Sequence, residues 1–93
     1  MTQVRWRIRF FGKVQRTGFR YTSLYCARDL CLTGWVWNLP DGSVLLEAQG
    51  GTADLRKLLI RMKSQPQIHI TDYTIRQIPP VPGEKTFCIR RGG

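Results

Sequence analysis

The spacing of apolar and polar residues predicts a strand followed by a helix in the first third of the chain. In "VRWRIRFFGKV", residues 4–14, apolar side chains alternate with arginines, which predicts a strand with one buried face and one wet, basic face. From about Phe19 to Leu32 the apolar residues recur at spacings of three and four, the period of a helix. These positions are Tyr21, Leu24, Ala27 and Cys31. Gly34 follows where a glycine would end that helix.

The middle of the chain predicts a hairpin and a second helix. "WVWNL" and "SVLLEAQ" have the composition of two short strands, and "PDG" between them supplies the residues of a tight turn. Thr52 is a suitable N-cap, and apolar residues then recur at helical spacing as far as Met62. Because lysines and arginines fill most of the other positions, we expect a helix with a solvated, basic back.

The last third of the chain predicts two further strands. "IHITDYTIRQI", residues 68–78, has strand composition, but its apolar phase shifts between Ile70 and Tyr73 and indicates a bulge. "PPVPG" is a rigid connector because its prolines fix the backbone. "KTFCIRR", residues 85–91, predicts a short final strand.

The order of these elements predicts the fold class. β-α-β-β-α-β with an additional short C-terminal strand is the split βαβ or ferredoxin-like sandwich of the α+β class. Right-handed crossovers place the third strand between the first and second, which gives an antiparallel sheet with both helices on one face. The ends of the first and second strands then lie on one edge of the sheet, roughly 10 Å apart. We therefore expect residues 12–20 and "WNLPDG" to be neighbours.

Length and composition narrow the class of protein. The 93 residues suffice for one hydrophobic core, so we expect a single domain over residues 1–93. A formal charge of +9 predicts an anionic partner, but charge alone does not identify it. No apolar run reaches the ~18 residues of a membrane span and the first residues lack a secretory signal, so we expect a cytoplasmic protein. Cys26, Cys31 and Cys88 form no CxxC pair, and we interpret them as reduced thiols packed in the interior.

The loop between the first strand and the first helix, "GKVQRTGFR" at residues 12–20, is the strongest candidate for a functional site. Successive backbone N–H groups in a tight loop can surround an anion, and the following helix adds a partial positive charge. Arg20 at the start of that helix would add a guanidinium that bonds two phosphate oxygens at once. The alternative is that Gly12 and Gly18 only form a turn and that Arg20 is a solvated helix residue.

Asn38 ends an otherwise apolar and aromatic strand, just before the Pro-Asp-Gly turn. Its amide offers a donor and an acceptor, so it would either orient a water molecule across the edge facing Arg20 or bond the backbone of its own turn. Asp41 also lies near this edge, but its place in Pro-Asp-Gly favours a turn role over that of a general base.

Two segments carry a resemblance to a known family. "GKVQRTGFR" resembles the G-x-V-Q-G-V-G-F-R motif of the acylphosphatase family, and "GWVWNLPDGSV" resembles its G-W-V-x-N-x-x-D-G-x-V segment, in the same order. The likeness covers essentially the whole chain. It implies a ferredoxin-like fold and hydrolysis of the carboxyl-phosphate bond of small acyl phosphates to a carboxylate and inorganic phosphate, with no metal or cofactor.

The resemblance also implies roles for individual residues. Arg20 matches the arginine that binds the phosphate, and Asn38 matches the asparagine that positions the attacking water. The cradle of backbone amides matches Gln15, Arg16, Thr17, Gly18 and Phe19. Arg16 replaces a glycine of the family pattern, and Thr17 replaces the usual valine. If position 16 requires a positive φ, Arg16 costs on the order of 1 kcal/mol there; its side chain would either narrow the mouth of the site or add a second cation.

Two alternative functions remain, and the first is from another class of protein. RNA-recognition modules share this order of elements, and Arg5, Arg7 and Arg9 with Phe11 on the uncovered face would suit RNA, but no RNP1-like run occurs in the third strand. A weakly active acylphosphatase-like regulatory domain is the other alternative. The expected partners are an acyl phosphate substrate and the phosphate product, with a monomeric chain and with neither nucleic acid nor a membrane.

Overall fold

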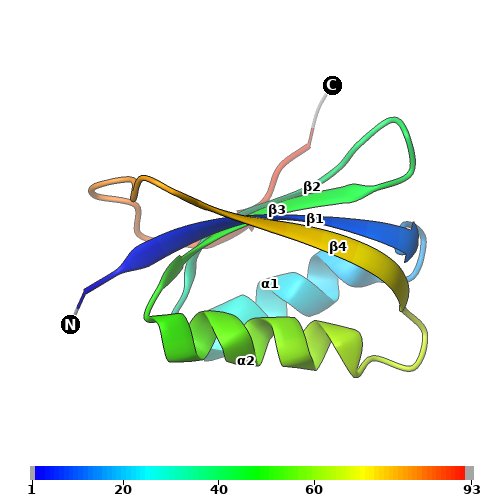
Figure 1. Cartoon of the computed structure of the whole chain (residues 1–93), viewed down its shortest axis with the longest axis horizontal. Helices are drawn as coiled ribbons and strands as arrows, with labels where there is room; N and C mark the ends of the chain where they lie inside the picture. Colours follow the sequence, from blue (N-terminus) through cyan, green and yellow to red (C-terminus); the bar gives the residue numbers. More distant parts are fainter. Residues whose placement is uncertain (1, 92–93) are drawn as a thin grey trace.

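The structure is a computed structural model and describes residues 2–91. Its helices and strands follow the predicted order, β-α-β-β-α-β with a short final strand (Figure 1). The elements are β1 (Val4–Lys13), α1 (Phe19–Asp29), β2 (Thr33–Asn38), β3 (Val44–Gly50), α2 (Thr52–Lys63), β4 (His69–Ile78) and β5 (Phe87–Ile89).

The strands form one sheet in the order β4-β1-β3-β2-β5, and both helices cover the same face of it (Figure 1). β3 lies between β1 and β2, which confirms the predicted topology. The expectation of a wholly antiparallel sheet is wrong at one edge, because β5 pairs with β2 in parallel and makes the sheet mixed. The chain leaves β4 at the end of the sheet where β2 begins, so a strand that returns across that end runs in the direction of β2.

The core lies between the sheet and the two helices. The alternation of β1 sends Ile8 and Phe10 toward the helices, where both are buried, as the pattern predicts. In α1 the buried face is shifted from the predicted one, because Ser23 is buried while Tyr21 is 48% exposed. The main helical contributions to the core are Phe19, Leu24, Ala27, Leu55, Leu58 and Met62.

The end of α1 differs from the prediction. The helix stops at Asp29, and Cys31 adopts a φ of 57° in the position where a glycine usually ends a helix. The amide of Leu32 then bonds the carbonyl of Ala27 at 2.8 Å, which closes the turn. Gly34 instead lies within β2, where a Cβ would stand 1.9 Å from the carbonyl oxygen of Glu47. Its role is therefore close strand packing.

Two smaller expectations also change. Gly51 is the N-cap of α2, and Thr52 is the first helical residue, with no side-chain cap. Cys31 and Cys88 are exposed and Cys26 is half-buried, so the prediction of three interior thiols is wrong. All three are free thiols.

The predicted bulge in β4 is confirmed. Phe11 pairs with Asp72 and Gly12 pairs with Ile70, which leaves Thr71 as the additional residue. Gly12 has a φ of 116°, and a Cβ there would lie 2.3 Å from the carbonyl oxygen of His69. Glycine is therefore required where β1 leaves the sheet and enters the loop before α1.

The basic face of β1 is not uniformly exposed to solvent, because Arg5 is only 1% exposed. Its guanidinium donates to Glu47 and to Glu84, both at 2.7 Å, and Arg7 donates to the other carboxylate oxygen of Glu47. Glu84 belongs to the segment 79–86 between β4 and β5. This segment folds back over the sheet and removes Arg5 from water.

The side chain of Gln49 binds the backbone of the same segment. Its side-chain oxygen accepts from the amide of Val81 at 2.7 Å, and its side-chain nitrogen donates to the carbonyl of Val81 at 3.0 Å. We call Arg5, Glu47, Gln49 and Glu84 the Arg5 network. It fastens the connector to β5 onto the sheet.

Replacing Glu47 tests the Arg5 network. Burial raises the pKa of the Glu47 carboxyl, but hydrogen bonds from Arg5 and Arg7 outweigh burial and hold this pKa below its usual 4.5. The charged carboxylate therefore stabilises the fold above pH 4.5, and this stabilisation is lost as the pH falls through the lower folded pKa. Glu47→Gln should reduce the unfolding free energy at pH 7 by about 2–4 kcal/mol, and by less at pH 3.

Denaturant unfolding at pH 7 and pH 3 measures both effects. The matched control is Asp29→Asn, which breaks the exposed pair with Arg61 and should cost at most about 1 kcal/mol. Equal losses from Glu47→Gln at the two pH values would contradict the role given to its charge.

Candidate active site

The loop from residue 14 to residue 18 connects β1 to α1 in a tight turn. Arg16 has a φ of 63° and Gly18 a φ of 80°, both in the left-handed region. The hydroxyl of Thr17 donates to the carbonyl of Val14 at 2.7 Å and closes the loop on itself. Position 16 thus has the positive φ that favours glycine, which is the residue of the family pattern at this position. Arg16 adopts this φ at a cost of about 1–2 kcal/mol.

The start of α1 presents its backbone amides to this loop. The helix has no side-chain cap and no acidic residue in its first turn. The first N–H groups of a helix lack intrahelical acceptors and carry the positive end of its dipole. Phe19 is buried and packs against Phe10 with 4.9 Å between ring centroids, which fixes where the helix begins. This end of α1 is suited to an anion.

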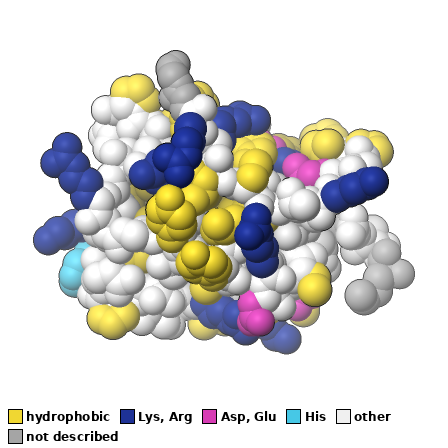
Figure 2. All heavy atoms as spheres, turned by 180° about the vertical axis from the view of Figure 1, so that it is seen from behind, with side chains coloured by type: hydrophobic (Ala, Val, Ile, Leu, Met, Phe, Trp, Pro, Cys, Tyr) yellow, Lys and Arg dark blue, Asp and Glu magenta, His cyan; other side chains and the backbone are white. Residues whose placement is uncertain are grey.

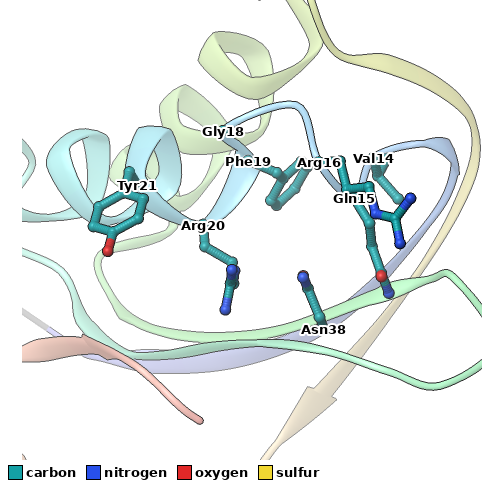
Figure 3. Close-up of a pocket in the computed structure, with 8 residues that line it drawn as sticks. All are labelled: Val14, Gln15, Arg16, Gly18, Phe19, Arg20, Tyr21 and Asn38. Atoms are coloured by element: carbon teal, nitrogen blue, oxygen red, sulfur yellow. The ribbon is translucent and has the colours of Figure 1, made fainter.

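A small cavity of about 60 Å³ lies beneath the loop. It is lined by residues 14–16 and 18 of the loop, residues 19–21 of α1 and Asn38 at the end of β2. Figure 3 shows the side chains of Arg20 and Asn38 turned toward the same space, while the side chain of Arg16 extends away from it. The cavity is larger than the space that one water molecule requires.

Asn38 has a buried polar atom that nothing in residues 2–91 satisfies. Its Oδ1 is shielded from solvent and has no hydrogen-bond partner within this part of the chain. A buried acceptor without a donor costs about 1–3 kcal/mol. The alternative that this oxygen bonds its own turn is therefore wrong.

The turn between β2 and β3 is held by other groups. The carboxylate of Asp41 accepts from the hydroxyl and the amide of Ser43, and its other oxygen accepts from Arg9. The hydrogen bonds from Ser43, followed by the one from Arg9, lower the pKa of Asp41. The predicted turn role of Asp41 is confirmed, and Asn38 is left with no part in closing the turn.

Gln15 connects the loop to this turn. Its side-chain nitrogen donates to the carbonyl of Leu39 at 2.7 Å and to the carbonyl of Ser43 at 2.9 Å. These bonds bring residues 12–20 beside "WNLPDG", as the topology predicts. The side chain of Gln15 is occupied by the turn, so what it offers the cavity is its backbone.

The structure brings together most of the residues that the sequence singled out. Six line the cavity: Gln15, Arg16, Gly18, Phe19, Arg20 and Asn38. Thr17 does not line it, because its hydroxyl turns back to Val14. Sequence reasoning missed Val14 and Tyr21, although Tyr21 directly follows Arg20. The helical spacing had placed Tyr21 in the core.

Within residues 2–91, no three side chains of histidine, cysteine, aspartate or glutamate gather closely enough to hold a metal ion. In the same part of the chain no helix is both long and apolar enough to span a bilayer.

Fold and cavity together define a ferredoxin-like protein with a small polar cavity at one edge of its sheet. The acylphosphatase family model matches residues 6–89. An acylphosphatase of Pediococcus pentosaceus is 40% identical over 78% of this chain and 83% of that protein. One from Methanospirillum hungatei is 41% identical over 86% of this chain and 89% of that protein.

A solved structure agrees with these relatives. The crystal structure of acylphosphatase from Bacillus subtilis superimposes with a TM-score of 0.88 at 31% identity, and the match covers 95% of this chain and 99% of that chain. The chain belongs to the acylphosphatase family, as the resemblance of its two motifs indicates.

Replacing Gln15 tests the connection between loop and turn. Gln15→Ala removes two side-chain hydrogen bonds, to the carbonyls of Leu39 and Ser43. Each carbonyl keeps one backbone donor, so the cost is that of the two lost bonds. We expect the unfolding free energy to fall by about 1–3 kcal/mol. Denaturant unfolding measures this, with the exposed Gln67→Ala as the matched control. If both variants lose the same amount, the two hydrogen bonds do not hold the loop.

Proposed function

We propose that the protein hydrolyses the carboxyl-phosphate bond of small acyl phosphates to a carboxylate and inorganic phosphate. The observation that carries this proposal is the cavity that Arg20 and Asn38 share with the tight loop and the first turn of α1. Membership of the acylphosphatase family supports the same reaction.

Phosphate binding is assigned to the loop and Arg20. The backbone amides of residues 15–19 form the cradle, and the N-terminus of α1 adds its partial positive charge. The planar guanidinium of Arg20 bonds two phosphate oxygens together, which orients the group as well as neutralising it. These donors stabilise the charge that spreads over the phosphoryl oxygens in the transition state.

Asn38 is assigned to the attacking water. Its side-chain amide forms a hydrogen bond with that water and leaves an oxygen lone pair directed at phosphorus. The water oxygen forms the new bond to phosphorus, and the bond from phosphorus to the acyl oxygen breaks with both its electrons leaving on the carboxylate. A proton of the water passes to solvent or to the product phosphate. Because a carboxylate is a good leaving group, positioning and charge stabilisation suffice without a general base.

The RNA-binding alternative finds little support on the uncovered face. Arg5 is buried in its network, Arg7 is paired with Glu47, and Arg9 is paired with Asp41. The alternating arginines thus already pair with carboxylates, which neutralise the positive charge that a row of RNA phosphates would require.

Alanine variants of Arg20 and Asn38 test the proposed roles. Arg20→Ala should lower kcat/KM for acetyl phosphate at least ~100-fold, because it removes the charge that opposes the phosphoryl oxygens. Asn38→Ala should lower kcat by about 100-fold with little change in KM, because it acts on the water and not on the substrate. It should also keep the unfolding free energy within about 1 kcal/mol of the wild type, since no protein donor loses a partner.

Steady-state kinetics on acetyl phosphate and denaturant unfolding give these values. Arg56→Ala is the matched control, because Arg56 is an exposed arginine of α2 outside the cavity. A wild-type rate no higher than that of Arg20→Ala would overturn the proposed function. A large loss of stability in Asn38→Ala would show that its amide serves the fold.

Variants of Arg16 separate its charge from its backbone conformation. The side chain is exposed and lies at the loop, so we expect it to contribute a modest attraction to the phosphate. Arg16→Ala should weaken inhibition by inorganic phosphate about twofold to fivefold, because it removes the cation and keeps a Cβ at positive φ. Arg16→Lys should stay close to the wild type.

Arg16→Gly completes this comparison. It removes the charge and also the left-handed strain, while it makes the unfolded chain more flexible, so the unfolding free energy should change by less than about 1 kcal/mol. Its inhibition constant for phosphate should match that of Arg16→Ala. If Arg16→Gly binds phosphate more tightly than the wild type, the side chain obstructs the cradle.

A further inference from the structure

A second hollow lies on the face of the sheet that the helices leave uncovered. Its volume is about 270 Å³, and it is lined by Arg7, Arg9, Leu39, Leu45, Thr74 and Arg76. We call it the Arg76 hollow. It shares no residue with the cavity at the start of α1. Its volume is near the lower end of the range of small-molecule sites, about 300 Å³, so a small ligand fits it.

Two guanidinium groups of the hollow come from directly opposed positions of neighbouring strands. Arg7 of β1 pairs with Arg76 of β4 in the antiparallel register. Like charges at such positions destabilise a sheet. Nε and Nη2 of Arg7 lie 2.7 and 2.6 Å from Oε2 of Glu47, whereas Arg76 is exposed and makes no ion pair within residues 2–91. An anion beside Arg76 would relieve this opposition of charges.

The charges on this face indicate how many anionic groups the ligand has. The three arginines of β1 on this face are balanced by three carboxylates, which belong to Asp41, Glu47 and Glu84. The guanidinium of Arg76 is therefore the surplus charge of this cluster. It can donate two parallel hydrogen bonds to one carboxylate or phosphate group. A ligand with one such group matches this surplus, and a polyanion does not.

Positive charge alone does not distinguish a site on this protein. Figure 2 shows lysines and arginines spread over the side of the molecule that faces away from the view of Figure 1, with few acidic side chains among them. The Arg76 hollow differs because two half-buried leucines, Leu39 and Leu45, line it together with the guanidinium groups. Apolar atoms of a ligand would leave water against these leucines while its anionic group meets Arg76.

We propose that the Arg76 hollow binds a small organic anion that joins one carboxylate or phosphate group to an apolar body. Arg76 binds the anionic group, and Leu39 and Leu45 contact the apolar body. Because the guanidinium of Arg76 is exposed, binding is modest, with a dissociation constant in the millimolar range. This site is separate from the cavity and does not depend on the proposed hydrolysis.

Benzoate and phenyl phosphate are probes of this chemistry, and an NMR titration of the ¹⁵N-labelled protein locates where each one binds. The backbone amides around the hollow, at residues 7–9, 45 and 74–76, should shift and saturate. Acetate and inorganic phosphate lack the apolar body and should bind there about threefold or more weakly. The tighter of the two probes identifies the anionic group.

Variants of Arg76 test its role. Arg76→Gln removes the surplus charge and should weaken binding of both probes at the hollow about threefold to tenfold. Arg76→Lys keeps the charge but not the planar fork, so its loss should be smaller. The matched control, Arg56→Gln, alters an exposed arginine of α2 outside the hollow and should leave binding unchanged. The unfolding free energy of Arg76→Gln should not fall, because one of two opposed like charges is gone.

Several results would overturn the Arg76 hollow as a site. Shifts confined to residues 14–21 would place both probes in the cavity instead. Equal binding by the wild type and Arg76→Gln would remove the role of Arg76, and an equal loss from Arg56→Gln would assign the attraction to the overall charge. Acetate that binds as tightly as benzoate, and phosphate as tightly as phenyl phosphate, would show that the leucines contribute nothing. Hydrolysis of acetyl phosphate is measured separately, so its failure would leave this inference standing.

Discussion

The candidate site depends on the position of β3 between β1 and β2. Because both neighbours pair antiparallel with β3, they run in the same direction and finish at the same end of the sheet, two strand spacings apart. The loop after β1 and the turn after β2 therefore face each other across that gap, and Gln15 joins them. Arg20 and Asn38, eighteen positions apart in sequence, reach one cavity for this reason.

Much of this arrangement could be predicted from the sequence, because local patterns determine it. The alternation in β1, the Pro-Asp-Gly turn and the shifted phase near Thr71 are all visible in a few consecutive residues. The two motifs indicate Arg20 and Asn38 as candidate site residues through their resemblance to the family pattern. What remained hidden depends on contacts between distant segments. The alternation in β1 predicts a solvated Arg5, but Glu84 of the distant segment 79–86 binds its guanidinium. The helical spacing predicts a core position for Tyr21, but the residue lines the cavity.

Stability is lower than it could be at two points of the site. Arg16 holds a backbone conformation that an L-residue adopts at a cost, and Asn38 keeps a buried oxygen without a donor. Both departures from a locally consistent fold lie at the cavity, which is where a protein that uses its structure for binding is expected to place them. The Arg5 network, at the opposite end of β1 and β3, differs, since Nε and Nη1 of its buried guanidinium donate to Glu47, Gln49 and Glu84.

The bulge at Thr71 has a consequence for how the chain behaves beside copies of itself. β4 is an outer strand whose free backbone edge is a possible template for another chain. The additional residue interrupts the regular ladder, Asp72 and Arg76 are exposed along the strand, and two prolines follow its end. A second molecule that approached this edge would meet a twisted strand with charges on it. The sheet that carries the cavity is thus protected from strand-by-strand aggregation on this side.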